Sequence, residues 1–229
     1  MIPLLLIPGM MCDARMWGEV ASTFAERPVH HALPVEGSTT TAMASAILHD
    51  APPRFALAGL SMGGIVAMEM LQQAPERIER LALLDTNPRA EADHVKRRRA
   101  AQIERVKSGD LAGVLRDEMK PHYLSPRASD PSILALCMQM ALDLGPEIFI
   151  RQSLALRDRP DRQGALARFH RPALVLTGEG DRLCPLDRHE LMHALMPQSR
   201  LVIVPDAGHL PTLERPTPTI AALRRWLEE

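Results

Sequence analysis

The sequence predicts an α/β fold, with a mainly parallel sheet of about six core strands, helices on both faces of the sheet and an inserted helical cap. Two observations support this prediction. Over most of the chain, short apolar runs alternate with segments of helical spacing, which is typical of a parallel sheet covered on both faces. Between residues 87 and 171 the alternation stops, and helical patterns follow one another without a strand. We therefore expect residues 1–88 and 170–229 to form the core and residues 89–169 to form the cap.

The core elements follow from apolar runs and from the residues that start or stop a helix. The first run, residues 2–8, has no basic residue before it and is interrupted by prolines, which favours a buried strand over a signal peptide. The helix expected at 40–50 follows hydroxyl residues that cap helix N-termini. The helix expected at 62–73 should end before Pro75, because proline cannot continue an α-helix. In chain order, the expected strands are 4–8, 29–35, 55–60, 80–86, 173–178 and 200–205, and the expected core helices are 15–26, 40–50, 62–73, 187–196 and 217–228.

The cap is predicted from helical spacing and from the turns that bound it. Apolar residues recur at i, i+3 and i+4 within 111–119 and again within 133–144. Turn-forming residues stand at both ends, Asn87-Pro88 before the segment and His170-Arg171-Pro172 after it. The run Lys96-Arg97-Arg98-Arg99 opens the cap, and we expect it to be a solvated helix face rather than an anion-attracting lip.

Composition excludes several functional classes. The chain has 229 residues and a formal net charge of −1, without a basic stripe of interleaved aromatic residues, so no nucleic-acid partner is expected. Its three cysteines lack paired spacing, which favours reduced thiols and a cytoplasmic location. No apolar run approaches the roughly 18 residues of a membrane span, so no membrane association is expected. The sequence leaves the oligomeric state open.

A sharp turn around Ser61 is the most informative local feature. The apolar run 55–58 precedes Gly59-Leu60-Ser61-Met62-Gly63-Gly64, and a helical pattern follows. A serine on such a strand-to-helix turn is held with unfavourable backbone dihedrals, so that its hydroxyl projects above the strand ends. Glycines two residues before and after it let the strand and the helix approach closely. The free N–H groups of the helix start favour an anion beside the serine.

Two further polar groups follow predicted strands. Asp181 ends the turn Gly178-Glu179-Gly180-Asp181, and His209 lies in the segment 205–211 after the last strand. The carboxyl ends of parallel strands meet at one edge of a sheet, which is where open α/β sheets hold their ligands. A serine hydroxyl needs a histidine to accept its proton and a carboxylate to orient that histidine. Ser61, Asp181 and His209 supply these three groups.

At these residues the sequence resembles the α/β-hydrolase superfamily, and the resemblance covers nearly the whole chain. It implies that Ser61 is the nucleophile, His209 the general base and acid, and Asp181 the orienting carboxylate. It also implies an oxyanion hole formed by the backbone N–H groups of Met10 and Met62, and a cap over the site. The matching segments are Ile7-Pro8-Gly9-Met10-Met11, Gly59-Leu60-Ser61-Met62-Gly63-Gly64, Gly178-Glu179-Gly180-Asp181 with Pro185, and Gly208-His209-Leu210-Pro211 with Glu214-Arg215-Pro216.

The chain departs from the family pattern in two places. The family often has His-Gly where this chain has Pro8-Gly9, which keeps the backbone donor. The first expected strand begins at residue 4, so we expect six core strands rather than eight. Some members place the acid after the preceding strand, where this chain has Asp85. We favour Asp181, because it has the Gly-x-Gly-Asp turn typical of the family, and we expect Asp206 to be a solvated loop residue.

A zinc site is the main competing interpretation. His189-Glu190-Leu191-Met192-His193 matches the His-Glu-x-x-His zinc motif and lies on an expected helix. A zinc site needs a third protein ligand, and the downstream candidates are Asp206 and His209. Because His209 is already required by the serine mechanism, we expect no metal and no cofactor.

The function predicted from these residues is cleavage of an ester or related acyl bond through a Ser-His-Asp triad and an acyl-enzyme. The substrate is expected to be a small to medium, mainly apolar molecule, because methionines that line pockets adaptably occur near the predicted site. The same fold also supports carbon–carbon bond hydrolysis, thioester cleavage and acyl transfer, and a non-catalytic ligand receptor is a further alternative. The methionines considered are Met10, Met11, Met62, Met119, Met138 and Met140.

Overall fold

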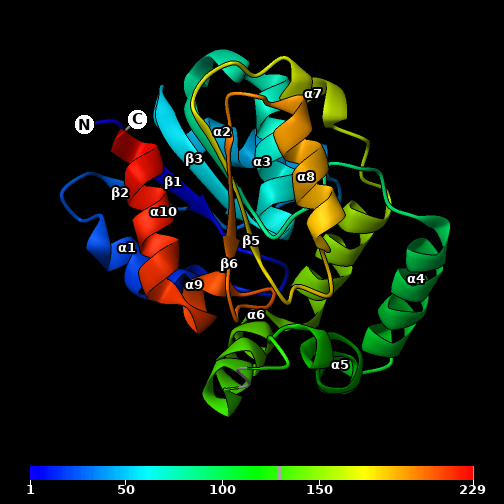
Figure 1. Cartoon of the computed structure of the whole chain (residues 1–229). Coiled ribbons are helices and arrows are strands. Elements are labelled where there is room, and N and C mark those ends of the chain that lie inside the picture. The colour runs from blue at the N-terminus through cyan, green and yellow to red at the C-terminus, as the bar shows by residue number, and fades with distance from the viewer. Residues whose placement is uncertain (128–129, 229) are drawn as a thin grey trace.

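A computed structural model of the chain, which describes residues 1–127 and 130–228, contains a six-stranded parallel sheet (Figure 1). The spatial order of the strands is β2-β1-β3-β4-β5-β6, and every neighbouring pair runs parallel. All six expected strands are present, which confirms the predicted sheet. Their bounds are β1 Leu4–Ile7, β2 Val29–His31, β3 Phe55–Leu60, β4 Ile78–Leu84, β5 Ala173–Gly178 and β6 Arg200–Val204.

Helices cover both faces of this sheet, because alternate strand residues point to opposite sides. Leu5 and Leu57 belong to one apolar cluster together with α2, α3 and α8, whereas Leu4, Leu6 and Ala58 belong to a second cluster together with α1 and α10. β1, β3 and β5 are buried along their whole length, as expected for central parallel strands. The core helices are α1 Glu19–Thr23, α2 Thr40–Asp50, α3 Met62–Gln73, α8 Leu186–Leu195, α9 Pro211–Glu214 and α10 Pro216–Glu228.

Two expected elements are shorter than the sequence pattern suggested. The helix expected at 15–26 is divided at Gly18, where φ is 47°, into a 3₁₀ turn over Ala14–Trp17 and the short helix α1. The strand expected at 29–35 ends at His31. This strand is at the sheet edge and pairs only with β1, and Pro34 has no N–H group to extend the ladder.

In the part that the structure describes, the segment between β4 and β5 contains helices joined by loops and no strand, and Figure 1 places most of it beyond one end of the sheet. The division of the chain into a core and a cap at residues 89 and 169 stays a prediction. Its longest helix, α6, is interrupted at Gly145, where φ is 79° and Pro146 follows. The elements are α4 Asp93–Lys107, α5 Leu111–Val114, a π-helical turn Leu115–Met119, a 3₁₀ turn Lys120–His122, α6 Pro131–Arg157 and α7 Gln163–Ala167.

Helix α6 is long and apolar enough, by length and composition alone, to cross a membrane. The break at Gly145 divides it into two pieces that are each shorter than a span requires. Cys137 and Met140 in the first piece and Phe149 in the second are buried in the two apolar clusters. The contacts of these residues therefore belong to the packing of the cap on the core.

Candidate active site

Ser61 stands on the turn between β3 and α3 with a strained backbone. Its φ is 55° and its ψ is −116°, which confirms the expectation of unfavourable dihedrals. A Cβ on Gly59 would collide with the backbone of Gly63, and a Cβ on Gly63 would collide with the carbonyl group of Ile7. Only glycine fits at these two positions, and the tight packing holds the serine in its unusual conformation.

The three residues predicted to act together meet at one edge of the sheet. The Nε2 atom of His209 lies 2.8 Å from Ser61 Oγ, and its Nδ1 atom lies 2.9 Å from Asp181 Oδ2. Ser61 follows β3, Asp181 follows β5 and His209 follows β6, so three strand ends supply the side chains. The order carboxylate, imidazole, hydroxyl is the arrangement required to move a proton from the serine to the histidine.

The carboxylate of Asp181 is buried, and both of its oxygen atoms accept hydrogen bonds. Its Oδ1 atom accepts hydrogen bonds from the backbone N–H groups of Leu183, at 2.8 Å, and Cys184, at 3.1 Å. Burial by itself would raise the pKa of Asp181, but the charge of His209 and the hydrogen bonds it receives hold that pKa below its ordinary value. Asp181 is therefore ionised at neutral pH and can stabilise a protonated His209.

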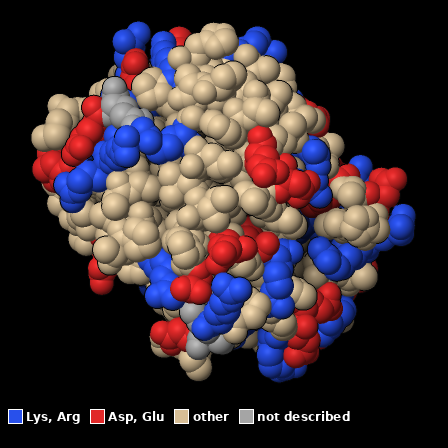
Figure 2. Space-filling view, in the orientation of Figure 1, with Lys and Arg blue, Asp and Glu red and all other residues tan. Residues whose placement is uncertain are grey.

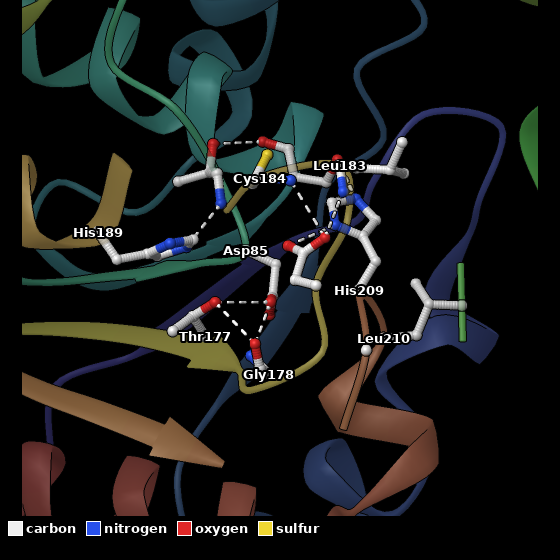
Figure 3. A network of polar contacts seen from close by, with 12 residues as sticks. Asp85, Thr177, Gly178, Leu183, Cys184, His189, His209 and Leu210 are labelled. Carbon is white, nitrogen blue, oxygen red and sulfur yellow. Dashed lines mark hydrogen bonds and ion pairs between the residues drawn. The ribbon is translucent and has the colours of Figure 1, made fainter. Parts of the chain in front are cut away.

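Asp85, the alternative acid, follows β4 and is hydrogen-bonded to β5 instead of His209 (Figure 3). Its Oδ1 atom accepts a hydrogen bond of 2.9 Å from the Gly178 N–H group and one of 3.4 Å from the Thr177 hydroxyl. Complete burial, together with the charge of Asp181, raises the pKa of Asp85 well above its ordinary value. The hydrogen bonds of Asp85 thus go to β5, and the geometry favours Asp181 as the partner of His209.

Two backbone N–H groups beside Ser61 have no partner among the described residues, those of Met10 and Met62. Met62 begins α3, and a Cβ on Gly9, next to Met10, would lie 3.4 Å from the Ser61 Cβ. Free N–H groups at a helix start and in an adjacent loop are the donors that an oxyanion hole needs. The predicted donors thus lie on either side of the serine.

Gln152, which sequence reasoning missed, holds the loop that carries Met10. This buried cap residue accepts a hydrogen bond of 2.8 Å from the Met11 N–H group and donates one of 3.1 Å to the Pro34 carbonyl. Met11 itself has a φ of 55°, so this loop is strained. No local pattern in the sequence marks Gln152, because both of its partners are distant in the chain.

Glu214 is a second residue whose position was not anticipated. Its carboxylate accepts hydrogen bonds from the N–H groups of Gly208, at 2.9 Å, Leu210, at 3.0 Å, and Ser125, at 2.8 Å. The His209 N–H group in turn donates to the Tyr123 carbonyl of the cap, at 2.7 Å. The histidine loop is therefore attached both to the core and to the cap.

A cavity of about 180 Å³ opens above Ser61, between the core and the cap. Of the six methionines considered from the sequence, Met10, Met62 and Met119 line it, whereas Met11, Met138 and Met140 do not. The cavity is smaller than the roughly 300–1,000 Å³ of pockets for drug-sized ligands, which favours a small substrate. The apolar lining continues with Cys12, Met16, Leu60, Ile65, Val95, Tyr123, Leu156, Leu183, Cys184 and Leu210.

The cap side of the cavity is charged, which the sequence did not lead us to expect. Glu91, Arg98, Arg99, Glu118 and Arg159 line it. The prediction of a wholly solvated face for residues 96–99 is therefore wrong at Arg99, whose side chain is only 16% exposed.

The histidines of the zinc motif have other partners. His189 is buried, and its Nε2 atom accepts a hydrogen bond of 3.2 Å from the Thr86 N–H group (Figure 3). Burial lowers the pKa of His189 to about 4, so it is neutral. His193 Nδ1 lies 2.8 Å from the Ser199 hydroxyl. Within residues 1–127 and 130–228, the one group of three potential metal ligands is Asp181, Cys184 and His209, and it coincides with the predicted triad.

Asp206 lies near the surface and forms an ion pair of 3.3 Å with Arg215. This placement agrees with the expectation of a loop residue without a catalytic contact.

Comparisons with known proteins agree with this geometry. A family model described as the alpha/beta hydrolase family matches residues 4–223. The pimeloyl-[acyl-carrier protein] methyl ester esterase of Aromatoleum aromaticum is 28% identical over 82% of this chain and 80% of that protein. The enzyme of the same name from Klebsiella pneumoniae subsp. pneumoniae is 25% identical over 93% of this chain and 88% of that protein.

Solved structures give the same result. A thermophilic esterase from Thermogutta terrifontis, described with malate bound, superposes with a TM-score of 0.90 at 30% identity, covering 100% of this chain and 90% of that one. The enol-lactonase of Burkholderia xenovorans, at 20% identity, has a TM-score of 0.88 over 100% of this chain and 92% of that one. This second likeness concerns the fold alone.

Proposed function

Because the chain belongs to the alpha/beta hydrolase family, we propose that it is a serine esterase that cleaves a small ester through Ser61, His209 and Asp181. The observation that carries the proposal is the continuous line of hydrogen bonds from Asp181 through His209 to Ser61. The names of its curated relatives support ester cleavage, since these relatives are methyl ester esterases. We expect the enzyme to need no cofactor and to work in the cytoplasm.

The first half of the proposed reaction forms an acyl-enzyme. Asp181 accepts the His209 Nδ1–H hydrogen bond, which leaves Nε2 free to accept the Ser61 proton. The serine oxygen attacks the ester carbonyl carbon, and the negative charge that develops on the carbonyl oxygen is stabilised by the Met10 and Met62 N–H groups. In related serine hydrolases, one such donor contributes about 10²–10³ in rate.

The second half releases the acid. Protonated His209 gives its proton to the departing alkoxide, and the alcohol leaves. A water molecule then loses a proton to His209 Nε2 and attacks the acyl carbonyl. Collapse of this second tetrahedral intermediate frees Ser61 and the carboxylic acid.

Labelling and kinetics test the proposal together. A fluorophosphonate should attach to Ser61, and a series of 4-nitrophenyl esters of increasing acyl length should give a burst followed by steady turnover. Ser61→Ala should abolish both labelling and turnover, whereas Ser22→Ala, which changes an exposed serine on α1, should leave both unchanged.

Two outcomes would overturn the proposal. Turnover that survives in Ser61→Ala would exclude this serine as the nucleophile. Saturable binding of the esters without product release would favour a ligand receptor, and selective turnover of thioesters or of carbon–carbon substrates would favour the alternative reactions of the fold.

A further inference from the structure

We propose that the ester carries a carboxylate, which is bound by Arg99 on the cap side of the cavity. This inference rests on the proposed esterase function and specifies its substrate class. Arg99 lies on α4 and lines the same cavity as Ser61 and His209. A small ester that fills a cavity of about 180 Å³ would therefore reach both the serine and the cap wall.

The first argument is a charge imbalance in a nearly buried cluster. Glu91 is the single carboxylate bound by both Arg99 and Arg159. Arg99 Nε lies 3.1 Å from Glu91 Oε2, and Arg159 donates from both terminal nitrogens at 3.0 and 3.1 Å. The side chains of Glu91 and Arg159 are 8% and 5% exposed. Two cations thus share one anion where solvent screens poorly, and a further anion would complete the cluster.

The second argument concerns the hydrogen-bonding capacity of Arg99. Its guanidinium uses Nε toward Glu91, and its remaining hydrogen-bond partner in the described part of the chain is the Met10 sulfur, 3.7 Å from one terminal nitrogen. A thioether is a weak acceptor, whereas a guanidinium has five N–H donors arranged to bind a carboxylate with two parallel bonds. Burial lowers the pKa of Arg99, which means that the protein compensates its charge incompletely.

The other charged lining residues do not neutralise this excess. Glu118 is bound by Gln102 and by Arg105, which also binds Asp110, so its carboxylate is engaged away from Arg99. Arg98, which is exposed and lines the cavity, has no ion pair among the described residues and adds a second positive charge. On the face drawn in Figure 2, acidic and basic side chains are interspersed instead of forming one basic field. The positive excess belongs to the cavity, which points to a small anionic substrate.

Matched ester pairs test the proposal. Monomethyl glutarate carries a carboxylate in its acyl chain, valeryl glycolate carries one in its alcohol, and methyl valerate is neutral. For at least one of the two anionic esters, the wild-type enzyme should have a kcat/KM at least about tenfold above that for methyl valerate. The anionic ester that is hydrolysed faster shows whether the bound carboxylate belongs to the acyl part or to the alcohol part of the substrate. Raising the ionic strength should weaken the anionic reaction and spare the neutral one.

Variants of α4 identify the group responsible. Arg99→Met should lower kcat/KM for the preferred anionic ester by about 10–100-fold and change that for methyl valerate less than about threefold. Arg99→Lys should recover part of the loss, because the charge remains without the paired donors. Arg97→Gln is the matched control, since Arg97 is exposed on the same helix and does not line the cavity, and it should leave both substrates unchanged.

Three results would overturn the inference. Equal hydrolysis of anionic and neutral esters by the wild type would reject the carboxylate site but would still support the proposed esterase function. An equal loss on both substrates in Arg99→Met would mean that Arg99 only supports the cap. No hydrolysis of any ester would reject both proposals. If Arg99→Met fails to fold, inhibition of the wild type decides the question: glutaramate, which carries a carboxylate, should compete with the substrate at least about tenfold more strongly than the neutral valeramide, and equal inhibition would refute the carboxylate site.

Discussion

The two walls of the cavity are built in different ways. The sheet wall holds Ser61, Asp181 and His209, each placed by the end of a strand and by backbone hydrogen bonds. The cap wall holds Arg99 and Arg159, which are placed by contacts with Glu91 between side chains that are distant in sequence. Under the proposed function, the sheet wall holds the reacting groups in place, and the cap wall selects the substrate.

The largest expected effect separates two carboxyl groups on the sheet wall. Asp181→Asn should lower turnover of a 4-nitrophenyl ester by about 10⁴, because the neutral amide can neither fix the imidazole tautomer nor stabilise its cation. Asp85→Asn should change turnover by less than about tenfold, because Asp85 bonds to β5 and not to His209. Equal losses, or a larger loss in Asp85→Asn, would reverse the assignment of the acid.

The second prediction compares a glycine of the core with a glycine of the cap. In Gly63→Ala the new methyl group would collide with the Ile7 carbonyl, so the free energy of unfolding should fall by about 3 kcal/mol or more. Gly164→Ala lies on α7 of the cap, where the new Cβ would meet only the flexible end of Arg168, and it should be neutral or stabilise by about 0.5–1 kcal/mol. Urea unfolding measures both changes, and equal stability in the two variants would contradict the rigid packing of the turn.

The third prediction uses the pH dependence of stability. His189 is buried with a pKa of about 4, whereas an unfolded histidine titrates at about 6.5. The unfolded chain therefore binds the additional proton, and stability that is fully present above pH ~6.5 should decline by about 3 kcal/mol as the pH falls toward ~4.

His189→Gln should remove this part of the pH dependence, as measured by unfolding at a series of pH values. His122→Gln, at an exposed position of the cap, is the control and should keep the wild-type slope. The same slope in His189→Gln as in the wild type would show that another group causes the decline.

The smallest expected effect concerns a contact between the cap and the core. Gln152→Leu leaves the Met11 N–H group buried without an acceptor, and stability should fall by about 1–3 kcal/mol. Because that loop carries Met10, kcat should also fall, by about tenfold, with little change in KM. Gln139→Leu, an exposed position on the same helix, should alter neither quantity. Similar effects in both variants would argue against a specific role of Gln152.

The sheet wall was predictable because its residues are encoded locally. The glycines around Ser61, the turn before Asp181 and the loop at His209 each follow a recognisable strand, and parallel topology brings the strand ends together. The predicted oxyanion donors are backbone groups of the Ser61 turn, for Met62, and of the loop after β1, for Met10. The expected lengths were wrong for the elements at 15–26 and 29–35, where Gly18 and Pro34 interrupt them.

The cap wall was predictable only as a set of helices. Helical spacing identifies the buried face of a helix, but it does not reveal which distant charge a side chain meets. Arg99 reads as part of a solvated basic run, and its burial depends on Glu91 and Arg159. Gln152 and Glu214 are similar cases, since their partners lie in segments that only the folded chain brings close.

The bond from the His209 N–H group to the Tyr123 carbonyl ties the loop of the proposed base to the cap. We expect any movement that lifts Tyr123 away from the core to loosen that loop as well. Under the proposed function, the imidazole would be best aligned with the serine while the cap rests on the core, so a molecule would have to be enclosed before it reacts.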